Sequence, residues 1–318
     1  MKIAIVGAGA IGTWVGARLA ETGHDLSALA RGDTLAALQS RGLGLKTGEQ
    51  TTFHPCRASA EAGALGVQDI VMIAVKAQAL PTLAPAIGSM IGTDTMVVPM
   101  LNGVPWWFMG EGQSLRSVDP ELSIERSIPR HALVGCVVHA SAAVPEPGIS
   151  HLRMCDKLIV GEPSGGVSAR VGALRDCLES AGIPTVTSED IRKEVWYKLW
   201  GNMTMNPMSA LTLATMDCLL DDPLLRTFAL QAMEEARSIG ARIGCPITES
   251  GEARMQVTRK LGAFKTSMLQ DVEAGRSLEL DALLAAPLEI AQAVGAEAPY
   301  LGALFGLART MGRSRQLY

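Results

Sequence analysis

The sequence lacks closely spaced cysteines and any long uninterrupted apolar run. Its six cysteines are scattered singly, with no CxxC pair and no Cys/His spacing typical of a metal site. We therefore expect no bound metal and interpret the cysteines as small buried residues of a reducing compartment. No stretch is long enough to span a bilayer, and a glycine-rich turn interrupts the apolar N-terminus, unlike a signal peptide. These absences predict a cytoplasmic protein that crosses no membrane.

The sequence also lacks an excess of basic residues and is poor in aromatic ones. Its 28 Lys and Arg against 32 Asp and Glu give a net charge of -4, and aromatics make up 4%. A protein that binds nucleic acid usually carries a basic patch, so we expect no nucleic-acid partner. The hydrophobic fraction of 48% predicts a compact globular protein, and 318 residues exceed the roughly 250 to 300 that one core usually serves. Two domains are therefore expected.

The chain opens with MKIAIVGAGAIG, in which a predicted strand, residues 2–6, meets a glycine-rich turn. A helix is predicted over 10–21 and a second strand over 25–30, which is the context of a dinucleotide-binding motif. Its glycines would allow a tight turn, a close approach of a pyrophosphate and close packing of helix on strand, although a plain βα turn is the alternative. The predicted cofactor residues of this turn are Gly7, Ala8, Gly9, Ala10, Ile11 and Gly12.

Arg31 follows the second predicted strand, where an acidic residue would bind the ribose 2′-hydroxyl of NAD. A cation there favours the 2′-phosphate of NADP, through charge-assisted hydrogen bonds. Asp33 is the competing residue, but it precedes an apolar segment and resembles a helix N-cap. Arg31 could also be an ordinary solvated loop residue. The pattern favours NADP(H) as the cofactor.

Further predicted strands and helices follow until Ser188, a predicted helix N-cap. After it, the strand signals end and helical periodicity dominates. The fold class expected is α/β, with an N-terminal Rossmann-like parallel-sheet domain over 1–187 and an all-helical domain over 188–318. The expected strands are 69–75, 96–101, 132–144, 149–160 and 184–187, with a hairpin over 43–53 and helices over 78–91 and 167–181.

Two polar positions follow predicted strands at the edge where ligands bind such sheets. Lys76 comes after the strand ending at 75, and Asn102 with Gly103 after the strand ending at 101. Each is as consistent with an ordinary loop as with contact to cofactor or substrate, because Asn-Gly is a common turn dipeptide.

The second domain holds a polar stripe within WYKLWGNMTMNPMSA. Lys198, Asn202 and Asn206 recur every four residues and share one helix face, among Trp, Leu and Met. Such a stripe faces water, a buried polar network or a ligand. Downstream, Ser267 could cap a helix, and Glu279, between two leucines, could be an exposed helical charge. A lysine and a carboxylate beside a nicotinamide would, however, suit carbonyl reduction.

These residues together resemble the ketopantoate reductase family, the 2-dehydropantoate 2-reductases. The resemblance runs from residue 1 to about 284 and depends on GAGAIG, Arg31, the VK and NG dipeptides, KLWGNMTMNP, and TSMLQD followed by Glu279. It implies catalysis in a cleft between the two domains, with Lys198 as general acid and Glu279 as its partner. It also implies NADPH-dependent reduction of 2-dehydropantoate to (R)-pantoate, on the route to pantothenate and coenzyme A.

The resemblance assigns the remaining roles as well. Asn102 would lie by the nicotinamide and the substrate, Ser267 would bind the substrate carboxylate, and Asn202 and Asn206 would line the site. Lys76 would lie near the cofactor ribose. A homodimer is left open.

The chain departs from the family pattern at three places. Phe264 stands where members often have a substrate-binding asparagine, residues 214–217 lack another, and the segment 104–130, with Trp106 and Trp107, is long enough for a lid or an interface. A different branched 2-oxoacid is therefore an alternative substrate. Two other interpretations remain. A β-hydroxyacid dehydrogenase is disfavoured by SMLQD with Glu279, and a non-catalytic NADP-binding sensor is disfavoured because Lys198 and Glu279 are retained.

Overall fold

The computed structural model describes residues 1–260 and 262–318, which divide into two compact units. The boundary expected between residues 187 and 188 stays a prediction. The division between the units falls inside one helix, and two short segments from the N-terminal half of the chain belong to the second unit. The first unit comprises Met1–Leu101, Trp106–Ser114 and Asp119–Glu194, and the second comprises Asn102–Pro105, Leu115–Val118 and Val195–Tyr318.

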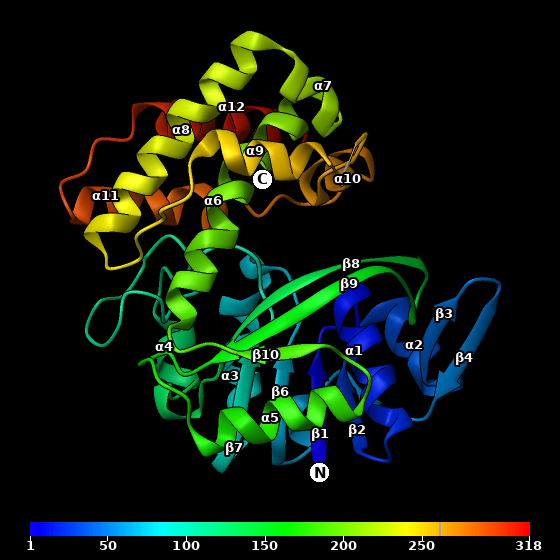
Figure 1. Cartoon of the computed structure of the whole chain (residues 1–318). Coiled ribbons are helices and arrows are strands. Elements are labelled where there is room, and N and C mark those ends of the chain that lie inside the picture. Colours follow the sequence, from blue (N-terminus) through cyan, green and yellow to red (C-terminus); the bar gives the residue numbers. More distant parts are fainter. Residues whose placement is uncertain (261) are drawn as a thin grey trace. The chain divides into compact units, whose positions relative to one another are not determined.

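A parallel sheet forms the centre of the first unit, as the apolar strands predict (Figure 1). Its middle strand is buried along most of its length and pairs on both sides with parallel neighbours. This arrangement places the carboxyl ends of all five strands at one edge, where a cofactor would bind. In spatial order the strands are β5 (Arg57–Ser59), β2 (Asp25–Leu29), β1 (Lys2–Val6), β6 (Gln68–Ile73) and β7 (Ile91–Pro99).

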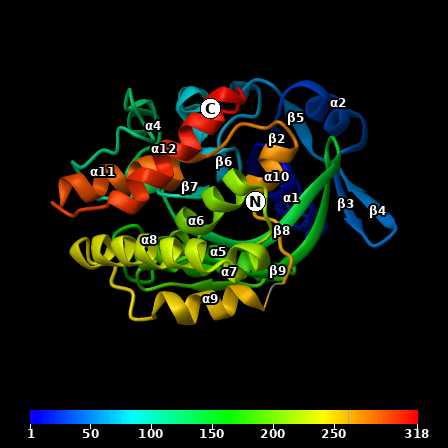
Figure 2. The ribbon, with the colours of Figure 1, turned by 90° about the horizontal axis from the view of Figure 1, so that it is seen from above.

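The expected hairpin belongs to a second, mixed sheet rather than to the parallel one. β3 (Leu43–Thr47) pairs antiparallel with β4 (Gln50–His54), and β3 also lies parallel to β9 (Ile149–Gly161). β8 (Gly135–Glu146) and β9 form a long antiparallel ribbon that stays side by side in both views (Figure 1 and Figure 2). β10 (Thr185–Thr187) completes this sheet beside β9.

The helix after the glycine motif is packed between the two sheets. A Cβ added at Gly16 would lie 2.9 Å from Cγ1 of Ile5 in β1 and 3.0 Å from Cδ1 of Leu43 in β3. Both sheets therefore share one hydrophobic core with this helix. The helices of the first unit are α1 (Ala10–Glu21), α2 (Gly32–Arg41), α3 (Leu80–Gly88), α4 (Ser123–Ser127) and α5 (Ala169–Ser180), with 3₁₀ turns η1 (Ala62–Ala64), η2 (Ala77–Ala79) and η3 (Arg130–Ala132).

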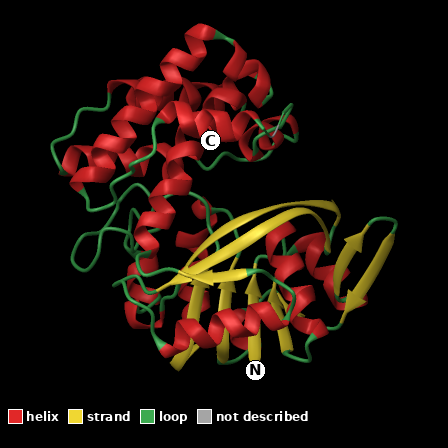
Figure 3. Ribbon diagram, in the orientation of Figure 1, coloured by secondary structure: helices red, strands yellow, loops and turns green. Residues whose placement is uncertain are grey.

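The described residues of the second unit form helices joined by loops, without a β-strand, as expected (Figure 3). Within residues 1–260 and 262–318, we find no helix with the length and apolar character needed to cross a membrane. The helices are α6 (Ile191–Thr212), which begins in the first unit, α7 (Met216–Asp221), α8 (Pro223–Arg242), α9 (Gly251–Arg259), α10 (Ser267–Glu273), the π-helix η4 (Asp281–Ala285), α11 (Ala286–Ala293) and α12 (Pro299–Ser314).

The expectations for Ser188 and Cys218 are wrong. Ser188 does not cap the long helix, which begins at Ile191; its hydroxyl accepts a bond from the Asp190 N–H at 3.2 Å within the preceding turn. Cys218 is exposed rather than buried, because it lies on the face of α7 opposite the buried Met216 and Leu219, and Cys56 and Cys155 are only partly buried. All six cysteines are free thiols.

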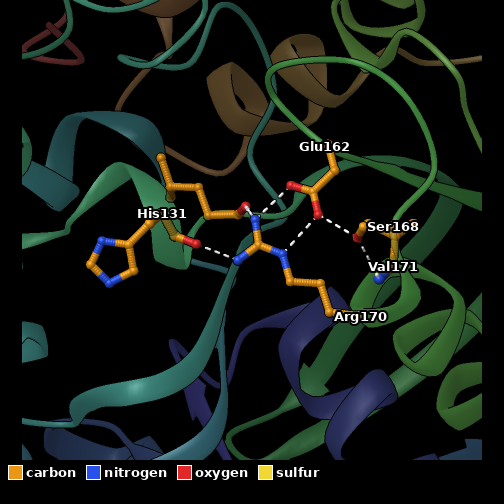
Figure 4. Close-up of polar contacts among 6 residues, drawn as sticks. His131, Glu162, Ser168, Arg170 and Val171 are labelled. Carbon is orange, nitrogen blue, oxygen red and sulfur yellow. Dashed lines mark hydrogen bonds and ion pairs between the residues drawn. The ribbon is translucent and has the colours of Figure 1, made fainter.

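A charged cluster joins the end of β9 to the start of α5 (Figure 4). Arg170 donates to both carboxylate oxygens of Glu162, at 2.7 and 2.5 Å, and to the carbonyls of His131 and Leu133. The Ser168 hydroxyl donates to the same carboxylate at 2.5 Å. The hydrogen bond from Arg170 lowers the pKa of Glu162 below its ordinary value of 4.5, against the opposing effect of burial.

Replacing Glu162 by glutamine should lower the free energy of unfolding by about 2 kcal/mol near neutral pH, because Arg170 loses its charged partner. The control Glu234→Gln, which breaks an exposed pair with Arg237 on α8, should cost less than about 1 kcal/mol. The ionised Glu162 stabilises the fold fully above pH 4.5, and this contribution is lost as the pH falls through its lowered pKa. Urea denaturation at several pH values should therefore show that the difference in the free energy of unfolding between the wild type and Glu162→Gln becomes smaller in acid. A constant difference would contradict this assignment.

Candidate active site

The glycine loop after β1 turns tightly and leaves part of its backbone open. Gly7 has φ +91°, and a Cβ there would lie 2.5 Å from Cγ1 of Val75. A Cβ at Gly12 would overlap the carbonyl oxygen of Gly7. At Gly9, by contrast, a Cβ would meet nothing within 4 Å. Two of the glycines thus serve the packing of the turn, and the third leaves the backbone open to a ligand.

The N-terminus of α1 is free to hold an anion. Gly9 occupies its N-cap, no side chain caps the first turn, and no acidic residue lies in it. The amide groups of that turn and the positive end of the helix dipole are suited to phosphate oxygens. The other predicted residues of the loop offer backbone alone to such a ligand, because their side chains are apolar: Ala8, Ala10 and Ile11.

Arg31 lies just beyond the end of β2, at the edge of the sheet that carries the glycine loop. The last residues of β2, β1 and β6 are in register, Leu29 beside Val6 and Val6 beside Ile73. Arg31 is exposed with extended backbone, and no residue of the described chain gives its side chain a hydrogen bond or ion pair. Its guanidinium is therefore available to an anionic ligand.

The expectation that Asp33 is the N-cap of the next helix is wrong. Arg31 occupies that position. Asp33 lies inside the first turn of α2, where its carboxylate interacts favourably with the positive end of the helix dipole. Lys76, the other predicted cofactor residue at this edge, is half-buried at the N-cap of η2, shortly after β6 ends. The geometry brings its backbone to the same edge of the sheet as the glycine loop, since the Ala74 N–H donates to the carbonyl of Val6 at 2.8 Å.

Two predicted residues of the second unit are in direct contact. The ammonium of Lys198 on α6 donates to Oδ1 of Asn102 at 2.9 Å, although the residues are 96 positions apart in the sequence. Both side chains are half-buried. An ammonium group that an amide oxygen holds in one direction has a geometry that a general acid can use.

The turn that carries Asn102 is held against the π-helix of the second unit. Gly103 has φ +82°, and a Cβ there would lie 2.5 Å from the carbonyl oxygen of Ala282. The Val104 N–H donates to that same oxygen at 2.8 Å. Asn102 and Gly103 were expected either in an ordinary turn or in contact with cofactor or substrate. The contact with Ala282 was not expected, because no local pattern links this turn to a residue so distant in the chain.

The polar stripe on α6 is not a solvated face. Lys198 and Asn202 are half-buried, and Asn206 is only 9% exposed. Neither asparagine amide has a hydrogen bond to the described residues, so both retain capacity to bind a ligand. The adjacent faces are anchored in the core, with the indoles of Trp196 and Trp200 bonded to carbonyls of α8.

Tyr197, beside Lys198, is a less suitable proton donor. Its hydroxyl already donates to Oε2 of Glu249 at 2.5 Å, and the guanidinium of Arg254 lies 4.9 Å from its ring centre. Burial, together with the hydrogen bond to Glu249, raises the pKa of Tyr197. We interpret it as an anchor for α6, which leaves Lys198 as the acid candidate on this helix.

Ser267 and Glu279 lie at two turns of the second unit. Ser267 is exposed as the first residue of α10, and the predicted cap is wrong because Thr266 occupies that position and accepts from the Leu269 N–H at 3.1 Å. Glu279 is half-buried just before the π-helix, not on an exposed helical face. It precedes by one turn the Ala282 carbonyl that holds the Asn102 segment.

The remaining expectations concern the long segment after Asn102 and metals. Trp106 and Trp107 are each 2% exposed, and the ring of Trp107 lies against Gly135 in β8, so neither presents an exposed lid surface. Within the described residues, no three His, Cys, Asp or Glu side chains gather into a set that could hold a metal ion.

Comparison with known proteins identifies the family. The family model "Ketopantoate reductase PanE/ApbA" matches residues 3–165, and "Ketopantoate reductase PanE/ApbA C terminal" matches residues 190–312. A 2-dehydropantoate 2-reductase of Mesorhizobium japonicum is 39% identical, with both chains covered completely.

Solved structures agree with this result. A protein of Ralstonia solanacearum MolK2, named as a candidate ketopantoate reductase, is 50% identical with a TM-score of 0.97, covering 100% of this chain and 99% of its own. A D-mandelate dehydrogenase crystallised with NADH and anilino(oxo)acetate shares the fold, with a TM-score of 0.85 at 22% identity over the whole of both chains. The chain therefore belongs to the ketopantoate reductase PanE/ApbA family of oxidoreductases.

Proposed function

We propose that the protein reduces 2-dehydropantoate to (R)-pantoate with NADPH, in the synthesis of pantothenate and coenzyme A. The observation that carries the proposal is the hydrogen bond from Lys198 to Asn102. This bond supports Lys198 as an oriented proton donor in a chain whose family binds a nicotinamide cofactor. A sensor that only bound the cofactor would not need such a donor.

The residues of the second unit would divide the work of the reduction. When bound, the nicotinamide cofactor would supply the hydride that the carbonyl carbon accepts. Lys198 stabilises the charge that develops on the carbonyl oxygen and donates a proton to it from Nζ. Glu279 orients the lysine or a hydroxyl of the substrate, and Ser267 binds the carboxylate. Asn202 and Asn206, whose amides have no partner in the described chain, line the same site.

The residues of the first unit would hold the cofactor. The open backbone at Gly9 and the uncapped start of α1 fit its pyrophosphate. Arg31 fits a 2′-phosphate and so favours NADPH over NADH, and Lys76 would bind near the ribose. Asn102 would approach the nicotinamide. The mandelate dehydrogenase bound to NADH resembles this chain in fold alone, so Arg31 carries the cofactor preference.

Phe264 favours one alternative substrate class. Its side chain is 37% exposed, and an aromatic ring at this position cannot replace the hydrogen bonds of an amide. A branched 2-oxoacid without a hydroxyl group would lose less by that change than 2-dehydropantoate.

The test is the oxidation of NADPH, followed by absorbance, with 2-dehydropantoate and a panel of branched and aromatic 2-oxoacids. We expect 2-dehydropantoate to give the largest kcat/KM of the panel. We also expect kcat/KM to be larger with NADPH than with NADH. Faster turnover of another 2-oxoacid would overturn the pantoate assignment and retain the chemistry, whereas no turnover with any member would overturn the enzyme proposal. Light scattering of the same preparation tests the homodimer.

A further inference from the structure

The π-helix of the second unit changes which backbone N–H groups can reach the carbonyl of Ala282. The Ala286 N–H donates to the carbonyl of Asp281, five positions back. An α-helix would instead pair that N–H with the carbonyl of Ala282. The next donor in the π register is position 287, which is proline and has no N–H. In the π register Pro287 leaves the Ala282 carbonyl without a helical donor, and in the α register of α11 it does the same for Leu283.

The freed carbonyl binds the turn that carries Asn102. It accepts the Val104 N–H at 2.8 Å, and it lies so near Gly103 that a Cβ there would be 2.5 Å away. Asn102, the first residue of the turn, accepts the hydrogen bond of Lys198 at 2.9 Å. The path from Ala282 to the Lys198 ammonium is therefore continuous, through one backbone bond, one close contact and one side-chain bond.

We propose that Pro287 is a positioning residue: by lacking an N–H, it keeps the Ala282 carbonyl free to hold the Asn102 turn, and so aims Asn102 at Lys198. This inference rests on the proposed function, in which Lys198 is the proton donor. A π-turn and a proline are both unfavourable in a helix. Such local costs are typical of functional sites, where the tertiary contact they permit compensates for them.

The first test is Pro287→Ala, which restores an N–H one π-turn after Ala282, where it can compete with the Val104 N–H for the Ala282 carbonyl. We expect the melting temperature to hold or rise, because alanine favours the helix. The Val104 amide should exchange its hydrogen at least about tenfold faster, and kcat for the 2-oxoacid should fall about tenfold, while the Kd for NADPH is unchanged. The control Pro223→Ala at the first position of α8 should change none of these, because a donor there has no helical partner.

A double-mutant cycle with Asn102→Ala separates positioning from a general structural effect. If Pro287 acts through Asn102, Pro287→Ala should lower kcat no further in the Asn102→Ala background. Gly103→Ala, which pushes the turn away from Ala282, should reproduce the loss of kcat and of Val104 protection.

Three results would overturn the inference. They are full additivity in the cycle, retained protection at Val104 in Pro287→Ala, or faster exchange there without loss of turnover. If the wild type reduces no 2-oxoacid, the proposed function fails, and hydrogen exchange at Val104 still decides whether Pro287 controls the docking of the turn.

Discussion

Replacing Lys198 by alanine is expected to lower kcat about a thousandfold while leaving the Kd for NADPH nearly unchanged. The alkoxide that forms at the substrate carbonyl would lose both its stabilising charge and its proton donor. The predicted cofactor residues, apart from Asn102, lie in the first unit, whereas Lys198 belongs to the second. Steady-state rates and a fluorescence titration with NADPH measure the two effects separately.

Two further variants sharpen this prediction. Lys193→Ala removes a lysine from the first turn of the same helix, where it is 51% exposed and paired with Asp190, and should leave kcat unchanged. Lys198→Arg keeps the charge but replaces the acid with a guanidinium that does not lose its proton at working pH, so it should stay slow. Near-normal turnover in Lys198→Ala would remove Lys198 from the mechanism.

Replacing Arg31 by alanine is expected to raise the Kd for NADPH about thirtyfold and to change the Kd for NADH little. The guanidinium is exposed and has no partner in the described chain, so a 2′-phosphate is the group it would bind. NADH carries a hydroxyl at that position and would lose little. Isothermal titration with both cofactors measures the ratio.

The control for this variant is Arg41→Ala, at the opposite end of the same helix, where the guanidinium lies 3.8 Å from Glu146. It removes the same charge from the same helix, so it should alter the affinity for neither cofactor. An equal loss of NADPH and NADH affinity in Arg31→Ala, or no loss, would show that Arg31 is an ordinary solvated residue without a role in cofactor choice.

Local sequence predicted most of the first unit because its signals are local. Residues 3–6 are apolar, the next turn needs glycine, and the following helix has a regular apolar face, so each element is encoded by its own neighbours. Helix caps were predicted less well. Asp33, Ser188 and Ser267 are all good capping residue types, but in each case the helix begins elsewhere, because competing turns and neighbouring residues decide which position adopts the cap.

The sequence by itself determined the chemistry available to this protein: a glycine turn before a helix, a cation after the second strand, and a lysine with two asparagines on one helix face. These follow from spacing, since 3.6 residues per helical turn align every fourth side chain. Only the tertiary structure decided that Asn102 meets Lys198, that β3 pairs with β9, and that Ala282 holds the Asn102 turn. Such contacts join residues far apart in the chain, and their energy depends on burial and direction, which no local pattern records.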